Sequence, residues 1–133
     1  MLGGALLLTA ALAVWHRRRD GRLRTASTSG AGEDLRPLVP GSPGERATLL
    51  QFSSAFCAPC RATRRILAEV AEVVPGVAHV EVDAESHLEL VRRLGVLKTP
   101  TTLVLDARGR EVLRASGQPK KADVLHALTQ AVG

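Results

Sequence analysis

The two cysteines of the sequence, Cys57 and Cys60, are separated by two residues. An apolar, β-favouring run, residues 48–52, precedes them, and residues 61–74 follow with apolar side chains at helical spacing. The first cysteine therefore lies at the first turn of a predicted helix, where free backbone N–H groups and the helix dipole stabilise a thiolate. We expect Cys57 to ionise more readily than a free cysteine. Cys60, one turn further along, can attack a mixed disulfide on Cys57, so the pair is suited to dithiol–disulfide exchange.

Two other uses of a C-x-x-C pair explain the sequence less well. A structural zinc site takes four ligands, but the sequence has no second cysteine pair, and a metal would need a second copy of the chain or a distant histidine. The histidines are scattered without ligand spacing: His16, His79, His87 and His126. A purely structural disulfide across so short a loop would remove little conformational entropy from the unfolded chain. The sequence therefore predicts redox chemistry that uses no metal and no cofactor.

Three motifs, in this order, resemble those of the thioredoxin family. Residues 56–61, Phe-Cys-Ala-Pro-Cys-Arg, are similar to the family's Trp-Cys-Gly-Pro-Cys-Lys. Residues 95–101, Gly-Val-Leu-Lys-Thr-Pro-Thr, resemble its Gly-Val-x-x-x-Pro-Thr, and residues 106–110 resemble the hairpin turn that comes next. The resemblance covers residues 46–133 and implies a thioredoxin-like α/β fold, in which a central mixed sheet has helices on both faces.

Local patterns of the sequence predict the same order of elements. The predicted helices are residues 61–74, 85–94 and 120–132, and the predicted strands are residues 48–53, 77–82, 101–105 and 111–115. The last two strands form a hairpin. Strand–helix–strand followed by hairpin–helix also indicates a mixed sheet covered by helices.

The resemblance implies a role for individual residues of the site. Cys57 would be the attacking nucleophile and Cys60 the resolving thiol. The substrate would contact Phe56, Ala58, Pro59, Thr99 and Pro100. In the family the peptide bond before this proline is cis, a form that is costly except before proline. The Thr99 backbone would then bind an extended substrate chain; the alternative is an ordinary trans proline at the start of a strand.

The sequence departs from the family at a position six residues before the first cysteine. The typical member has a buried aspartate there, but this chain has Gln51, which cannot accept a proton at neutral pH. The position of a partnering lysine on the next strand is matched to Glu81. A carboxylate buried beside an apolar sheet holds its proton more tightly than in water, so Glu81 is a candidate proton acceptor for Cys60. The alternative is that Glu81 points into solvent at a strand edge.

The first residues predict a membrane anchor followed by a linker. Residues 1–15 are uncharged and mostly apolar, and a basic cluster follows at residues 16–19. Fifteen helical residues reach about 22 Å, short of a ~30 Å hydrocarbon core, but bilayer thinning and arginine snorkelling would cover part of the gap. Because arginines hold their side of a span in the cytoplasm, we expect a single-pass protein of the cell membrane with a cytoplasmic redox domain. A cleaved signal peptide and a later start of translation are alternatives.

The predicted organisation therefore has three parts. Residues 1–16 form the N-terminal transmembrane helix, and residues 17–45 form a basic juxtamembrane segment and a flexible linker rich in Ser, Gly and Pro. Residues 46–133 form the thioredoxin-like domain. Within the linker, residues 35–39 are a candidate edge strand.

The charge and the aromatic content argue against a nucleic-acid partner. The net charge of +5 and the pI near 10.2 would allow one. However, two phenylalanines, one tryptophan and no tyrosine leave no platform on which bases could stack. The basic residues after the apolar segment would instead favour anionic lipid headgroups.

Together these patterns predict a protein-disulfide reductase. Its partners would be disulfide-bearing proteins and a separate electron donor resembling thioredoxin reductase. Two alternatives remain open from the sequence. One is an exported thiol-disulfide oxidoreductase, either an oxidant or a protein of cytochrome maturation. The other is a non-catalytic binding module that keeps the thioredoxin fold.

Overall fold

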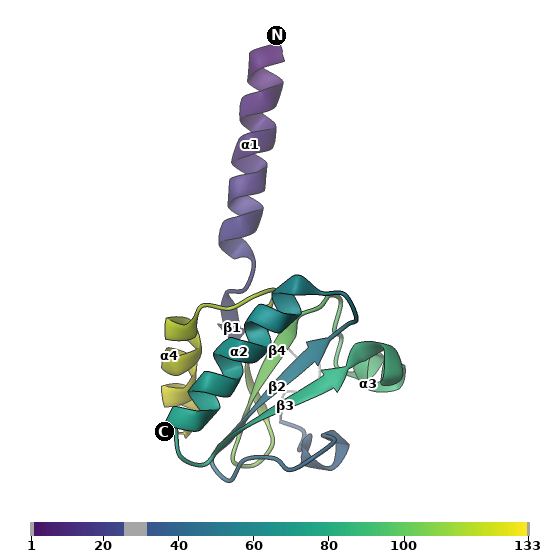
Figure 1. Cartoon of the computed structure of the whole chain (residues 1–133), viewed down its shortest axis with the longest axis vertical. Helices are drawn as coiled ribbons and strands as arrows, with labels where there is room; N and C mark the ends of the chain where they lie inside the picture. Colours follow the sequence, from purple (N-terminus) through teal and green to yellow (C-terminus); the bar gives the residue numbers. More distant parts are fainter. Residues whose placement is uncertain (1, 26–31, 133) are drawn as a thin grey trace.

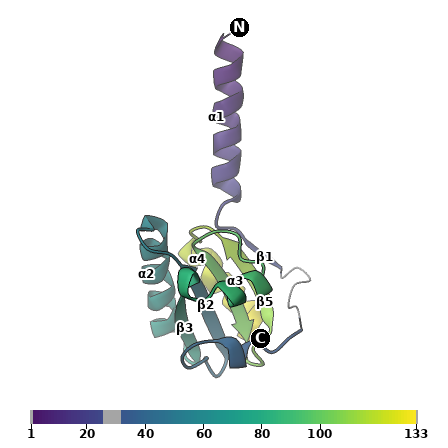
Figure 2. The same ribbon diagram turned by 90° about the vertical axis from the view of Figure 1, so that its right-hand side faces the viewer.

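The computed structural model describes residues 2–25 and 32–132 of the chain. Its helices are α1 (Leu2–Arg19), α2 (Ala58–Val73), α3 (Leu88–Arg93) and α4 (Lys121–Val132). Its strands are β1 (Leu23–Thr25), β2 (Ala47–Ser53), β3 (Val77–Asp83), β4 (Thr101–Asp106) and β5 (Glu111–Ser116). Short 3-10 helices cover Arg36–Leu38 and Ala84–Ser86. Helix α1 stands out from the α/β domain that the other elements form (Figures 1 and 2).

Within the described residues, the strands form one five-stranded sheet in the order β1-β5-β4-β2-β3. Strands β2 and β3 are parallel, and the other neighbouring strands are antiparallel. This arrangement confirms the predicted thioredoxin-like α/β fold with a mixed sheet. Every residue of β2 is buried, including the polar residues Thr48, Gln51 and Ser53.

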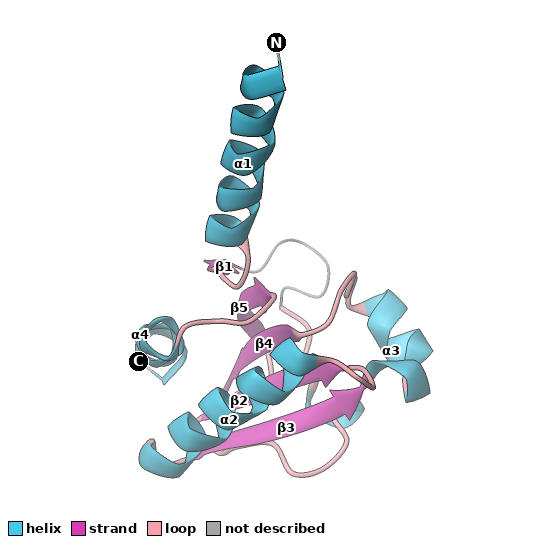
Figure 3. Cartoon of the chain, turned by 45° about the horizontal axis from the view of Figure 1, so that its top comes forward, coloured by secondary structure: helices cyan, strands magenta, loops and turns pink. Residues whose placement is uncertain are grey.

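Helices cover both faces of the sheet, as predicted. Successive residues of a strand point to opposite faces, so each face contributes its own apolar side chains to a cluster. Leu50 and Phe52 of β2 belong to one apolar cluster, against which the side chains of α3 pack. Leu49 belongs to the other cluster, together with Leu67 of α2 and Leu128 of α4. Helix α2 lies along β2 and β3 on this second face (Figure 3). This packing on the sheet therefore holds α2 in place, together with its first turn.

The predicted membrane anchor is wrong. Among the described residues, no helix is both long enough and apolar enough to cross a membrane. Helix α1 has 18 residues, and its last turn consists of His16 and three arginines. The apolar part of the helix is therefore shorter than the roughly 20 residues that a transmembrane helix needs. This finding also contradicts the predicted single-pass localisation in the cell membrane.

Parts of the predicted linker pack against the domain. Strand β1 pairs with the edge of β5 in antiparallel fashion. Leu35 and Val39 are buried in the apolar cluster on the α3 face, so packing begins before residue 46. The expected edge strand at residues 35–39 is not formed; Arg36–Leu38 form a 3-10 helix instead, with Pro37 in its first turn. Residues 26–31 of the predicted linker lie outside the described residues.

We expect Leu67→Ala to lower the free energy of unfolding by about 2–5 kcal/mol, because it leaves a cavity between α2 and the sheet. Leu67 is fully buried, whereas Val73 on the same helix is 66% exposed. The matched control Val73→Ala should change stability by no more than about 0.5 kcal/mol. Urea denaturation of the two variants measures the difference. Equal losses would contradict the assignment of Leu67 to the core.

Candidate active site

Cys57 and Cys60 form a disulfide at the start of α2, with their Cα atoms 5.2 Å apart. Cys57 caps the helix, and its sulfur accepts a hydrogen bond from the backbone N–H of Cys60 at 3.2 Å. The helix begins at residue 58 rather than at the predicted residue 61, because Pro59 in the first turn loses no helical hydrogen bond. Cys57 is half-buried, whereas Cys60 is only 1% exposed. The outer sulfur is thus the accessible one, and the N–H directed at it stabilises a thiolate.

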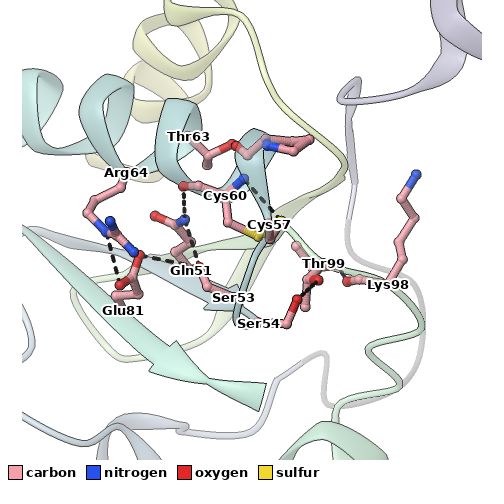
Figure 4. Close-up of a disulfide and its surroundings, with 12 residues drawn as sticks. Gln51, Ser53, Ser54, Cys57, Cys60, Thr63, Arg64, Glu81, Lys98 and Thr99 are labelled. Atoms are coloured by element: carbon pink, nitrogen blue, oxygen red, sulfur yellow. Dashed lines mark hydrogen bonds and ion pairs between the residues drawn. A yellow bond between two sulfur atoms is a disulfide. The ribbon is translucent and has the colours of Figure 1, made fainter. Parts of the chain in front are cut away.

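The Thr99–Pro100 peptide bond is cis, as the resemblance implied. Thr99 lies beside the cysteine pair, and its hydroxyl is 2.7 Å from that of Ser54 in the loop before Cys57 (Figure 4). Pro100 is buried, and its carbonyl accepts a hydrogen bond from Gly117 at 2.7 Å. The two loops that flank the disulfide are therefore tied to each other and to the sheet.

Exposed apolar side chains lie beside Cys57 in the chain and in the loop that precedes Thr99. Phe56 is completely exposed, and its φ of 57° lies in the left-handed region, where a bulky residue is unusual. Leu97, in the loop before Thr99, is 96% exposed. Ala58 and Pro59 are also exposed. The predicted substrate contacts from the α2 side thus line an accessible apolar surface, which is typical of a binding site.

A fully buried amide, Gln51, lies beneath Cys60. Its Nε2 donates hydrogen bonds to the Cys60 carbonyl and to the Ser53 hydroxyl, both at 2.9 Å (Figure 4). Its Oε1 is 2.9 Å from Nε2 of His79. Because the Cys60 carbonyl can only accept, the amide orientation is fixed, and Nε2 of His79 must carry the proton that Oε1 accepts.

Glu81 is opposite Gln51 in the β2–β3 register, as the sequence predicted, but its side chain is not buried. It is 30% exposed and makes an ion pair with Arg64 of α2 at 2.8 Å. Of the two possibilities that the sequence left open, exposure at a strand edge is the one observed, because β3 is an edge strand of the sheet. Glu81 is connected to the site indirectly. It accepts a hydrogen bond from the Ser53 hydroxyl at 3.3 Å, and Ser53 accepts one from Gln51. Its role as proton acceptor stays a prediction.

His79 is the residue that the sequence interpretation missed, because it, and not Glu81, contacts Gln51 directly. Burial lowers the pKa of His79, an effect that Arg64 reinforces and Glu81 opposes. The sequence holds one signal for this contact. His79 and Glu81 are two residues apart on one strand, so both point to the α2 face of the sheet.

No cluster of three His, Cys, Asp or Glu side chains in residues 2–25 and 32–132 is arranged to hold a metal ion.

We expect the variant His79→Gln to make stability less sensitive to mild acid. The pKa of folded His79 lies below its usual value of 6.5, so the unfolded chain binds more protons below that pH. The stabilising effect of neutral His79 is present above pH 6.5 and is lost as the pH falls through the folded pKa. The free energy of unfolding of the wild type should thus fall more steeply than that of the variant between about pH 7.5 and pH 5. Denaturant titrations at both pH values measure the free energy of unfolding of the two proteins. An equal change in this free energy between the two pH values would contradict the expectation.

Comparison with known proteins places this fold and this disulfide in one family. The model of the thioredoxin-like domain matches residues 41–132. The chain is 33% identical to thioredoxin of Alicyclobacillus acidocaldarius over 90 residues, which are 62% of this chain and 85% of that protein. It is 30% identical to thioredoxin of Mycobacterium tuberculosis over 88 residues, which are 65% of this chain and 75% of that protein.

Solved structures agree on the fold. A mutant thioredoxin from Halobacterium salinarum superposes with a TM-score of 0.62 and 19% identity, over 67% of this chain and 77% of the other. Spinach chloroplast thioredoxin F gives a TM-score of 0.62 and 22% identity, over 77% of this chain and 90% of the other. A C-x-x-C pair at disulfide distance within this fold supports thiol-disulfide oxidoreductase activity. Because the family model covers most of its length, the chain belongs to the thioredoxin-like family.

Proposed function

We propose that the protein reduces disulfides of other proteins by dithiol–disulfide exchange. The observation that carries this proposal is the asymmetry of the cysteine pair. Cys57 is the more exposed cysteine, and a backbone N–H stabilises its sulfur, while Cys60 is buried one turn further along. Kinship with thioredoxins supports the same reaction.

The reaction has two steps, each of which exchanges one sulfur–sulfur bond for another. The Cys57 thiolate attacks the substrate disulfide, forms a mixed disulfide and releases one substrate sulfur, which takes up a proton. Cys60 then loses its proton and attacks the sulfur of Cys57. This forms the Cys57–Cys60 disulfide and releases the second substrate sulfur, again with a proton. Two electrons and two protons pass from the protein to its substrate.

The substrate chain would lie over Phe56, Ala58 and Pro59 on one side and the loop of Thr99 and Pro100 on the other. Exposure of the first three residues makes room for it. The Thr99 backbone would hydrogen-bond an extended substrate segment, as in β-strand addition. The Ser54–Thr99 hydrogen bond holds that backbone beside Cys57.

Turnover needs a partner that returns the disulfide to the dithiol. We propose a separate dithiol donor of the thioredoxin-reductase kind, which supplies two electrons for each cycle. The oxidised pair would present Cys57 to this donor, since Cys57 has the more exposed sulfur-bearing residue. The functional domain would comprise residues 46–133 together with the packed residues that precede them.

Serine variants of the two cysteines test the reaction with a disulfide-containing peptide and a chemical dithiol as donor. Cys57→Ser should abolish reduction, because the nucleophile is lost. Cys60→Ser should accumulate a mixed disulfide through Cys57, which mass spectrometry detects. Absence of the trapped species would contradict the assigned order of attack.

An equilibrium titration against a dithiol buffer supplies an independent control. A midpoint near about −270 mV would support a reductase, whereas one near about −120 mV would indicate an oxidant. If no Cys57–Cys60 disulfide formed at any potential, the protein would be a binding module with the thioredoxin fold.

Glu81→Gln tests the proposed proton acceptor. Glu81 is the carboxylate in the hydrogen-bonded network that ends on Cys60. If it accepts the Cys60 proton, the variant should slow reduction at neutral pH by about tenfold, below the usual range for a direct general base. The free energy of unfolding should change little, because an exposed ion pair contributes little. Glu85→Gln, also exposed on the surface, is the matched control, and an unchanged rate in Glu81→Gln would remove Glu81 from the mechanism.

A further inference from the structure

A basic pocket of about 500 Å³ lies between the end of α1, strand β1 and the loop that precedes Pro100. Five basic side chains line it: His16, Arg19, Arg22, Arg24 and Arg114. Its single acidic lining residue is Asp20. The opposite wall is formed by residues 95–97, and Leu97 is the exposed residue described above.

The acidic lining residue of this pocket does not neutralise all of its arginines. Asp20 is already paired with Lys98, and Arg114 is paired with Glu111. In the described ranges 2–25 and 32–132, no ion pair engages Arg22 or Arg24. Both arginines are exposed. Arg24 in β1 and Arg22 just before it thus carry two guanidinium groups that are free to bind an anion.

The pocket is directly connected to the exchange site. Thr101, which lines it, follows Pro100 in the chain. The carbonyl of Ser116, which also lines it, accepts a hydrogen bond from Gly21 at 2.7 Å, and the next residue, Gly117, donates to Pro100. Gly21, just before β1, and the cis proline are therefore hydrogen-bonded to two consecutive residues, Ser116 and Gly117. Figure 1 shows the same relation at larger scale, since α1 rises from the end of the domain at which α2 begins.

We propose that this pocket binds an acidic segment of the protein substrate, next to the disulfide that is reduced. The inference rests on the proposed function and adds a substrate class to it. An extended chain that lies along Thr99 and Pro100 and continues towards Leu97 reaches the rim of the pocket. Carboxylates in that part of the substrate meet Arg22 and Arg24, whose planar guanidinium groups bind carboxylates through paired hydrogen bonds.

The physical character of the pocket sets the size of the effect. Its arginines are exposed, so each ion pair with substrate is weak and is screened by salt. Charges at such a rim mainly speed the encounter and raise kcat/KM. We expect a preference of about tenfold for an acidic substrate at low ionic strength.

Two disulfide peptides that differ only in flanking residues, a run of glutamates in one and glutamines in the other, test the proposal on the full chain. The wild type should reduce the glutamate peptide with the higher kcat/KM at about 20 mM NaCl, and the ratio should approach one at about 300 mM. The double variant Arg22→Gln/Arg24→Gln should lower the ratio at low salt. Arg65→Gln/Arg92→Gln removes the same charge from exposed arginines that do not line the pocket, so it should keep the wild-type ratio.

The outcomes separate this inference from the proposed function. If neither peptide is reduced, the proposed function itself fails. If both are reduced equally, or if the ratio does not depend on salt or on Arg22 and Arg24, the protein is a reductase without the acidic preference. Inorganic phosphate, added at constant ionic strength, should compete only with the glutamate peptide. Equal inhibition of both peptides would overturn the proposal and assign the pocket to a small anion.

Discussion

The burial of β2 on both faces of the sheet is the constraint on which the site depends. A strand with no exposed residue must satisfy each of its polar groups internally. Gln51 is the large polar side chain of that strand, and it has partners for both ends of its amide. One end binds the Cys60 carbonyl at the start of α2, and the other meets His79 on β3. A buried amide therefore ties the first turn of α2, which apolar packing already holds on the sheet, to both β2 and β3.

This arrangement positions Cys60 with a neutral group. An amide can donate to the Cys60 carbonyl at any pH, whereas an ionised carboxylate in the same place could only accept. Charge enters the network only at its outer end, where Glu81 and Arg64 pair at the surface. The cost of burying an ion beneath the disulfide is thus avoided, because the ion pair lies at the exposed end of the network and burial favours the neutral form of His79 by lowering its pKa.

The sequence predicted the parts of the site that depend on local pattern. The cysteine spacing, the cis proline and the order of strands and helices follow from short motifs and periodicity. The errors arose where position in the sheet decides the outcome. Glu81 is exposed because β3 is an edge, and that depends on β1 pairing with β5 instead. A three-residue strand containing a charged residue gives too weak a pattern to predict such a pairing. The contact between His79 and Gln51 likewise needs the relative positions of two strands.

The segment before the domain changes how the charge of the chain is interpreted. From sequence alone, the basic cluster after residue 15 indicated the inner end of a membrane anchor. In the structure, β1 continues the sheet beyond β5, and this pairing places Arg22 and Arg24 on the pocket wall near the cis proline. Backbone pairing with β5 fixes the position of β1. That position limits where the guanidinium groups of Arg22 and Arg24 can lie. The positive charge of Arg22 and Arg24 therefore lies next to the exchange site because β1 extends the sheet beyond β5. These two arginines are part of the folded domain.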